Sequence, residues 1–173
     1  TVMKRLLLLV VLGALIAPVA FGQTNVLSQN AVGYVKTTIG KGDLALITQP
    51  FYAIDASPQK VATVIGDQVP VGSRVFVWTG TAFDIENYQA GTKNDPDAWS
   101  DQYGHALEPG IGFFLEINPD APEESYEVYL LGEVPGSNNN SDTTELTKQD
   151  GLTLLGFPYP VSVIWADTQL AQT

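Results

Sequence analysis

The sequence contains no cysteine, one histidine and only 8 lysine and arginine residues among 173. Without cysteine, the chain forms no disulfide and offers neither a thiolate metal ligand nor a cysteine nucleophile. Its 19 aspartate and glutamate residues leave a formal net charge of -11. A surface this acidic repels phosphate backbones and anionic lipid headgroups, so the charge argues against binding to nucleic acid or to a membrane surface.

Charged residues are also few, at 16% of the chain, whereas 45% of the residues are hydrophobic. That hydrophobic content is ordinary for a protein with a packed core. The chain also contains 16 glycines and 11 prolines. Frequent glycine and proline favour many short elements joined by turns, so we expect a turn-rich domain that depends on its core for stability.

The N-terminal residues have the pattern of a signal peptide. Lys4 and Arg5 precede an apolar run at residues 6–16, and the small-x-small sequence Ala20-Phe21-Gly22 follows. This order predicts that residues 1–22 are removed on export, with cleavage after Gly22. The competing interpretation is a membrane anchor, but the apolar run is shorter than the roughly 20 residues that a spanning helix needs. We therefore predict a protein that is secreted or held at the cell surface, with no membrane span after cleavage.

A β-hairpin is predicted at the centre of the chain. Residues 74–78 place Val75 and Val77 on one face, and residues 82–88 alternate apolar and acidic side chains. Alternation with period two on both sides of Thr79-Gly80 is typical of two strands joined by a tight turn. Further strands are predicted at residues 30–39, 44–48, 108–117 and 126–134, and one short helix at residues 56–66, capped by Ser57 and ended by Gly66.

These elements predict an all-β fold, a small antiparallel β-sandwich or open barrel with at most one short helix. The nearly all-apolar residues 44–48 are expected to be a strand with both faces covered. The predicted core of the first unit comprises Leu46, Val75, Val77, Phe113 and Leu115.

Part of the sequence is repeated. Leu44, Leu46, Ile47 and the pair Pro50-Phe51 match Leu152, Leu154, Leu155 and the pair Pro158-Tyr159. Self-similarity of this kind indicates a repeated structural unit. We predict a β domain at residues 23–135, a linker at residues 136–149 and an incomplete second unit at residues 150–173. On this interpretation, both ends of the chain are the ends of a fragment.

The order of three motifs carries a family resemblance. These motifs are Gln49-Pro50-Phe51-Tyr52, Phe76-Val77-Trp78 and Pro109-Gly110-Ile111-Gly112-Phe113-Phe114. In this order they resemble a β-rich module of large secreted and surface proteins in Bacteroidetes, Verrucomicrobia and relatives, although an asparagine is missing before Pro50. Such modules look like surface scaffolding, so the resemblance implies a location and an architecture but no chemistry.

Three function classes are compatible with this sequence. The first is a non-enzymatic structural or interaction module whose partners are other surface or matrix components. The second is a carbohydrate-binding module that presents Trp99 and Tyr103, two loop aromatics, to a polysaccharide. The third is a secreted hydrolase, in which a Ser-His-Asp site would need His105 with Asp101 or another acid, but no G-x-S-x-G sequence is present. The first class is our leading hypothesis, and we expect no catalytic residues.

Calcium is the one cofactor that the sequence suggests. Asp95, Asp97 and Asp101 place oxygen ligands within one polar loop, which is the ligand chemistry that calcium prefers. The spacing of an EF-hand loop is absent, and aspartate is also a common turn residue. We therefore keep a calcium site at these three residues as a hypothesis.

Overall fold

The computed structural model describes residues 31–55, 57–135 and 152–157 of the chain. These residues form two antiparallel sheets, of two and five strands, with one very short helix and no closed barrel. The prediction of an antiparallel all-β fold is therefore confirmed. The strands are β1 (Val32–Gly40), β2 (Leu44–Thr48), β3 (Arg74–Trp78), β4 (Phe83–Gln89), β5 (Ala98–Trp99), β6 (Gly112–Glu116) and β7 (Ser125–Glu133), and the helix is α2 (Val61–Val64).

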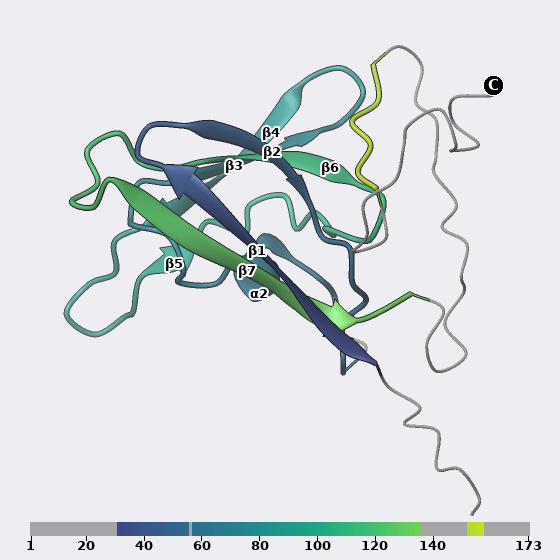
Figure 1. Cartoon of the computed structure of the whole chain (residues 1–173). Helices are drawn as coiled ribbons and strands as arrows, with labels where there is room; N and C mark the ends of the chain where they lie inside the picture. The colour runs from purple at the N-terminus through teal and green to yellow at the C-terminus, as the bar shows by residue number, and fades with distance from the viewer. Residues whose placement is uncertain (1–30, 56, 136–151, 158–173) are drawn as a thin grey trace, which may run out of the picture.

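The two sheets share one core. β1 pairs with β7, and the larger sheet has the order β2-β6-β3-β4-β5. The ribbon of β1 and β7 crosses the larger sheet diagonally in Figure 1. Buried side chains of this ribbon, such as Ile39 and Val128, belong to the same cluster as Val75, Phe113 and Leu115 of the larger sheet. One face of each sheet thus points into the core, and the other points outward.

The hairpin of β3 and β4 lies where the alternation predicts it. Thr79 N donates to Ala82 O at 2.9 Å, and Gly80 has a φ of 99°, in the left-handed region that favours glycine. Val75 and Val77 are 0% and 5% exposed, which confirms that they belong to the core. Phe76 and Trp78 lie on the opposite, outer face of the sheet because side chains alternate along a strand.

The predicted core is confirmed at Phe113 and Leu115, which are fully buried, but it is wrong at Leu46. Leu46 is 53% exposed, and its neighbour Leu44 is 56% exposed. The pairing register explains this outcome. Leu46 lies opposite Phe114 on the outer face, and Ala45 lies opposite Leu115 on the inner face. β2 therefore has one covered face and not two. The sequence could not predict which face is covered, because a nearly all-apolar run does not mark its solvent side with polar residues.

The helix is shorter than predicted. α2 covers only four residues, its N-cap is Lys60, and Ser57 bonds to Asp55 instead of capping the helix. Lys60 forms an antiparallel bridge with Ala106, and Leu107 N donates to Gln59 O at 2.7 Å. This pairing holds the backbone extended up to Lys60, so a helix begins only after it. Gly66, with a φ of 60°, follows the helical turn.

The predicted strands at residues 30–39 and 126–134 correspond to β1 and β7, whereas β5 was not predicted. Among the described residues, no helix has the length and apolar character needed to cross a membrane. The predicted signal peptide at residues 1–22 and the predicted linker at residues 136–149 lie outside the described residues. Only residues 152–157 of the predicted second unit are described.

Candidate functional site

The neighbouring strands β3 and β6 part from each other at one end. They pair only between Arg74–Phe76 and Phe114–Glu116. β3 continues two residues further, to Trp78, and β6 begins two residues earlier, at Gly112. The edge of β6 that faces β3 is therefore not paired with β3 at Gly112. We call this break between the two strands the β3–β6 split.

Residues 152–157 enter the β3–β6 split from far along the sequence. Gly112 N donates to Leu154 O at 3.2 Å, and Gly156 N donates to Gly110 O at 3.0 Å. Between these two bonds, Ile111 and Leu155 form an antiparallel bridge. The segment thus takes the place of a strand beside the start of β6, where it satisfies backbone groups that β3 leaves unpaired.

Two glycines allow this close approach. A Cβ atom at Gly112 would lie 3.2 Å from the backbone of Leu155, and a Cβ atom at Gly156 would lie 2.1 Å from the side chain of Thr48. The segment therefore lies directly against β6 and the end of β2. The indole of Trp78 adds a polar contact, because its Nε1 donates to Leu152 O at 2.5 Å.

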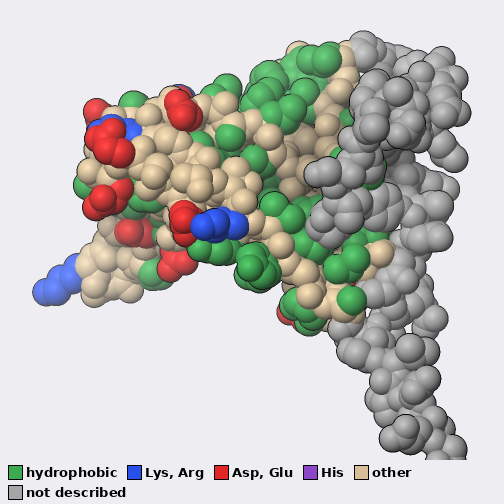
Figure 2. All heavy atoms as spheres, viewed as in Figure 1, with side chains coloured by type: hydrophobic (Ala, Val, Ile, Leu, Met, Phe, Trp, Pro, Cys, Tyr) green, Lys and Arg blue, Asp and Glu red, His purple; other side chains and the backbone are tan. Residues whose placement is uncertain are grey.

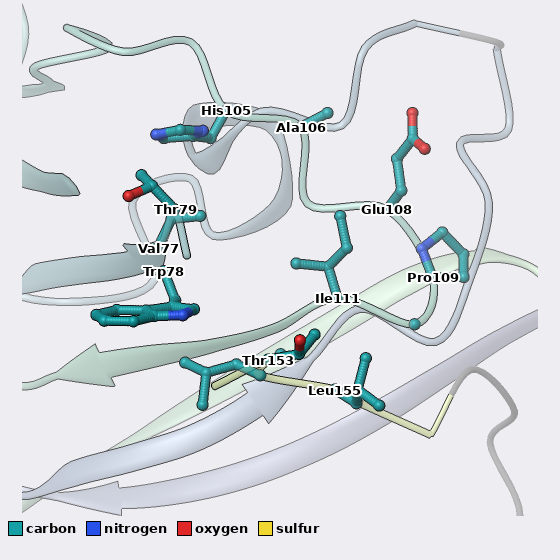
Figure 3. Close-up of a pocket in the computed structure, with 13 residues that line it drawn as sticks. Val77, Trp78, Thr79, His105, Ala106, Glu108, Pro109, Ile111, Thr153 and Leu155 are labelled. Atoms are coloured by element: carbon teal, nitrogen blue, oxygen red, sulfur yellow. The ribbon is translucent and has the colours of Figure 1, made fainter. Parts of the chain in front are cut away.

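A pocket of about 460 Å³ remains beside the segment. Figure 3 shows Trp78 and Thr79 on one side of the pocket and Ile111 on the other, with Thr153 and Leu155 below. The carboxylate of Glu108 points away from Ile111 in the same view. The lining thus combines apolar and aromatic side chains with polar ones, among them Thr79, His105 and Thr153, and with backbone groups that an extended peptide could meet.

His105 borders this pocket and pairs with Asp84, not with Asp101. Its Nε2 lies 2.7 Å from Asp84 Oδ2, and Tyr103 stacks on its ring at a centroid distance of 5.9 Å. Asp101 instead forms an ion pair with Lys60 at 2.8 Å. Ser73, in the sequence Val-Gly-Ser-Arg, is fully buried and accepts a hydrogen bond from Asn118 N. A hydrolase would thus have the histidine–carboxylate pair His105 and Asp84 at this pocket. The buried Ser73 is not placed to act as its nucleophile.

The structure does not bring Trp99 and Tyr103 onto one exposed surface. Trp99 is 7% exposed, its Nε1 donates to Gly66 O at 2.8 Å, and its ring lies against Tyr88. Tyr103 is 47% exposed. Trp99 therefore contributes to the core, and of the two residues only Tyr103 is exposed.

The three aspartates of the calcium hypothesis have separate partners. Asp95 Oδ2 accepts from Thr92 Oγ1, Asp97 Oδ1 accepts from Gly91 N, and Asp101 pairs with Lys60. In the described ranges, no group of three or more histidine, cysteine, aspartate or glutamate residues is arranged to hold a metal ion. A calcium site at these residues stays a prediction, and binding would have to displace these contacts.

Glu86 is the polar residue that the sequence analysis missed. It is 1% exposed, and its carboxylate accepts hydrogen bonds from Ser100 Oγ, from Gln102 N at 3.0 Å and from Tyr103 N at 2.9 Å. Burial alone would raise the pKa of Glu86, but these hydrogen bonds outweigh it and lower the pKa below 4.5. No local feature of the sequence marks Glu86 as buried, because its burial follows from the pairing register that places it opposite the core residue Val75.

The fold and the β3–β6 split define an antiparallel β protein that holds an extended segment of chain in a break between two strands. No protein-family model matches the chain, and no curated protein or solved structure matches it either. The resemblance to surface modules of Bacteroidetes and Verrucomicrobia therefore stays a hypothesis.

Proposed function

We propose that this chain is a non-enzymatic interaction module of an exported protein, at the cell surface or in the extracellular matrix. Export is supported by Lys4 and Arg5, the apolar residues 6–16 and the small-x-small sequence before Gln23. Interaction is supported by the β3–β6 split. The observation that carries the proposal is the antiparallel bridge between Ile111 and Leu155.

The contacts of residues 152–157 support an extended peptide as the partner of the split. Its contacts are backbone hydrogen bonds at Gly110 and Gly112, and an indole hydrogen bond to the carbonyl of Leu152. Backbone pairing of an extended peptide supplies affinity in many recognition domains, and pockets beside the strand supply specificity. The proposed ligand is therefore an extended, mainly apolar peptide that contains a glycine, as residues 152–157 do.

The polar groups of the described core support a non-enzymatic role. The buried carboxylate of Glu86 is occupied by three hydrogen bonds that hold the loop after β5. Asp84 and His105 are paired with each other. Glu86, Asp84 and His105 thus each have a partner within the fold, and the proposal assigns them a structural role.

A peptide-binding experiment tests this function. A fluorescent peptide with the sequence of residues 150–159 is titrated into the full chain and into two variants, and fluorescence anisotropy reports binding. In Gly156→Val, the new side chain collides with Thr48, so the chain's own segment should leave the split and the peptide should bind in its place. The unaltered chain should bind the peptide more weakly, because its own segment competes.

Gly112→Val is the matched control. The nearest atoms to a Cβ at this position belong to the backbone of Leu154 and Leu155, so the added side chain should block the split. We expect this variant to bind the peptide no better than it binds a scrambled peptide. Equal binding by all three proteins, or by none of them, would refute the proposed function.

Carbohydrate binding is the second candidate, and one observation favours it. Tyr34 on β1 is 67% exposed, and its ring lies 6.5 Å from that of Tyr129 on β7. The hydroxyl of Tyr129 donates to Glu127 Oε2 at 2.6 Å, which restrains the ring. Exposed, restrained aromatic rings suit stacking on a sugar. Retardation of the chain in a gel that contains polysaccharide, lost in Tyr34→Ala and kept in Tyr103→Ala, would support this function.

A further inference from the structure

The outer edge of β2 is an unpaired sheet edge in the described part of the chain. β2 is the last strand in the order of the five-stranded sheet, and it pairs only with β6. Ile117 N donates to Asp43 O at 3.1 Å just before β2 begins. Since hydrogen-bonded pairs alternate in an antiparallel ladder, Ala45 and Ile47 bond to β6. The backbone groups of Leu44, Leu46 and Thr48 therefore point away from β6.

The side chains of β2 do not protect this edge. Natural edge strands are commonly shielded by lysine, proline or a bulge, which discourage pairing with another chain. Residues 44–48 have the sequence Leu-Ala-Leu-Ile-Thr, with neither a charge nor a proline. β7 provides a contrast, because Gln68 covers its edge by accepting from Tyr129 N at 2.7 Å and donating to Tyr129 O at 3.2 Å.

The surface beside β2 is also apolar. Leu46 lies opposite Phe114, and the ring of Phe83 contacts the rings of Phe76, Trp78 and Phe114 on the same outer face. Figure 2 shows hydrophobic side chains gathered along the top of the molecule, and acidic side chains mainly toward the left of the view. An apolar surface of this kind commonly marks an interaction site.

Charge does not prevent two copies from meeting at this face. The chain as a whole carries a net charge of -11, but the charged residues of the outer face of β3 and β6 neutralise each other. Arg74 Nε and Glu116 Oε2 form an ion pair. This pair reduces the repulsion between two copies that meet at this face. β1 also has a long edge, but it carries Lys36 near its middle, in an ion pair with Glu127 of β7, and a lysine at a strand edge discourages pairing.

We propose that two copies of this chain pair antiparallel through their β2 edges and form one continuous sheet. A pair with twofold symmetry needs a self-complementary surface. Pairing centred on Leu46 places Leu46 opposite Leu46 of the second copy, and Leu44 opposite Thr48. Residues 152–157, which resemble β2 in sequence, form one antiparallel bridge beside the start of β6, between Leu155 and Ile111. The β3–β6 split takes no part, and the inference is independent of the proposed function.

Sedimentation velocity of the full chain over a range of concentrations tests this inference, with two variants. Leu46→Lys replaces an exposed side chain and brings two ammonium groups together at the axis of the pair. We expect its dissociation constant to rise about tenfold or more. Tyr34→Lys is the control, since Tyr34 is also exposed but lies on the edge strand β1. It should associate as the unaltered chain does, and circular dichroism should show that both variants are folded.

Hydrogen exchange adds a second measurement. The amide of Leu46 should exchange more slowly as the concentration of the unaltered chain rises, because the paired copy accepts its hydrogen bond. An unaltered chain that stays monomeric would overturn the proposal. Association that survives in Leu46→Lys would also overturn it. If association is lost only in Tyr34→Lys, the interface lies on β1 and the proposal is likewise overturned. Concentration-independent exchange at Leu46 would have the same consequence.

Discussion

Glu86 offers the most direct test of how this fold is held together. Its carboxylate accepts hydrogen bonds from Ser100 Oγ and from the backbone amides of Gln102 and Tyr103, and it is 1% exposed. Glu86→Gln keeps the size of the side chain and removes its charge. One of the two acceptor oxygens becomes an amide group that faces donors. Hydrogen bonds to charged groups contribute about 1.5–3 kcal/mol each, so we expect a loss of about that size in the free energy of unfolding at neutral pH.

The pH dependence gives a second, independent readout. Because the pKa of Glu86 is lowered in the folded chain, its contribution to stability is complete above the ordinary glutamate value of 4.5. That contribution is lost as the pH falls below 4.5 and through the lowered pKa. The difference in stability between the unaltered chain and Glu86→Gln should therefore shrink in this range, because both side chains then become neutral.

Urea denaturation, followed by circular dichroism across this pH range, measures both effects. The exposed Glu123 provides the control, and Glu123→Gln should leave the unfolding midpoint nearly unchanged. The reasoning would be refuted if Glu86→Gln cost less than about 0.5 kcal/mol, the range of ordinary surface substitutions. A difference from the unaltered chain that stays constant down to low pH would refute the assignment of the ionised carboxylate.

Three further predictions concern the core, the calcium hypothesis and export. Phe113→Ala should cost about 3–5 kcal/mol in urea denaturation because Phe113 is fully buried, and Leu46→Ala should cost much less; similar losses would contradict the observed strand phase. If calcium binds at Asp95, Asp97 and Asp101, millimolar calcium should raise the melting temperature and Asp97→Asn should abolish the rise, whereas an unchanged melting temperature would contradict the calcium hypothesis. N-terminal sequencing of the exported protein should begin at Gln23, and a mature form that keeps residues 6–16 would contradict cleavage after Gly22.

Period-two alternation and turn residues were enough to locate most of the strands. β3 and β4 were predictable because Val75, Val77, Phe83 and Ile85 alternate about a turn that contains Gly80, and these are local features of the chain. The same reasoning located β1 and β7, and it identified Val75, Val77, Phe113 and Leu115 as core residues. Repetition of the pattern of residues 44–52 also drew attention to residues 152–157, which the structure places in the β3–β6 split.

Other features depend on contacts between residues far apart in the sequence. β2 has apolar side chains on both faces, so only its pairing with β6 decides that Leu46 points outward. Trp99 belongs to a stretch with a polar sequence, but it lies in β5, its ring packs on Tyr88 and its Nε1 donates to Gly66 O. The helix is shortened by the bridge between Lys60 and Ala106. None of these contacts leaves a trace in local periodicity.

The sequence by itself therefore determined the fold class, most strand positions and the export signal pattern, because these follow from local side-chain alternation, turn chemistry and composition. Only the tertiary structure decided the phase of β2, the buried role of Glu86 and the position of residues 152–157. The physical reason is that the alternation of side chains along a strand distinguishes its two faces but does not specify which element packs on either face. That choice is made by the register of distant strands, and at the β3–β6 split by two glycines that let a third segment approach.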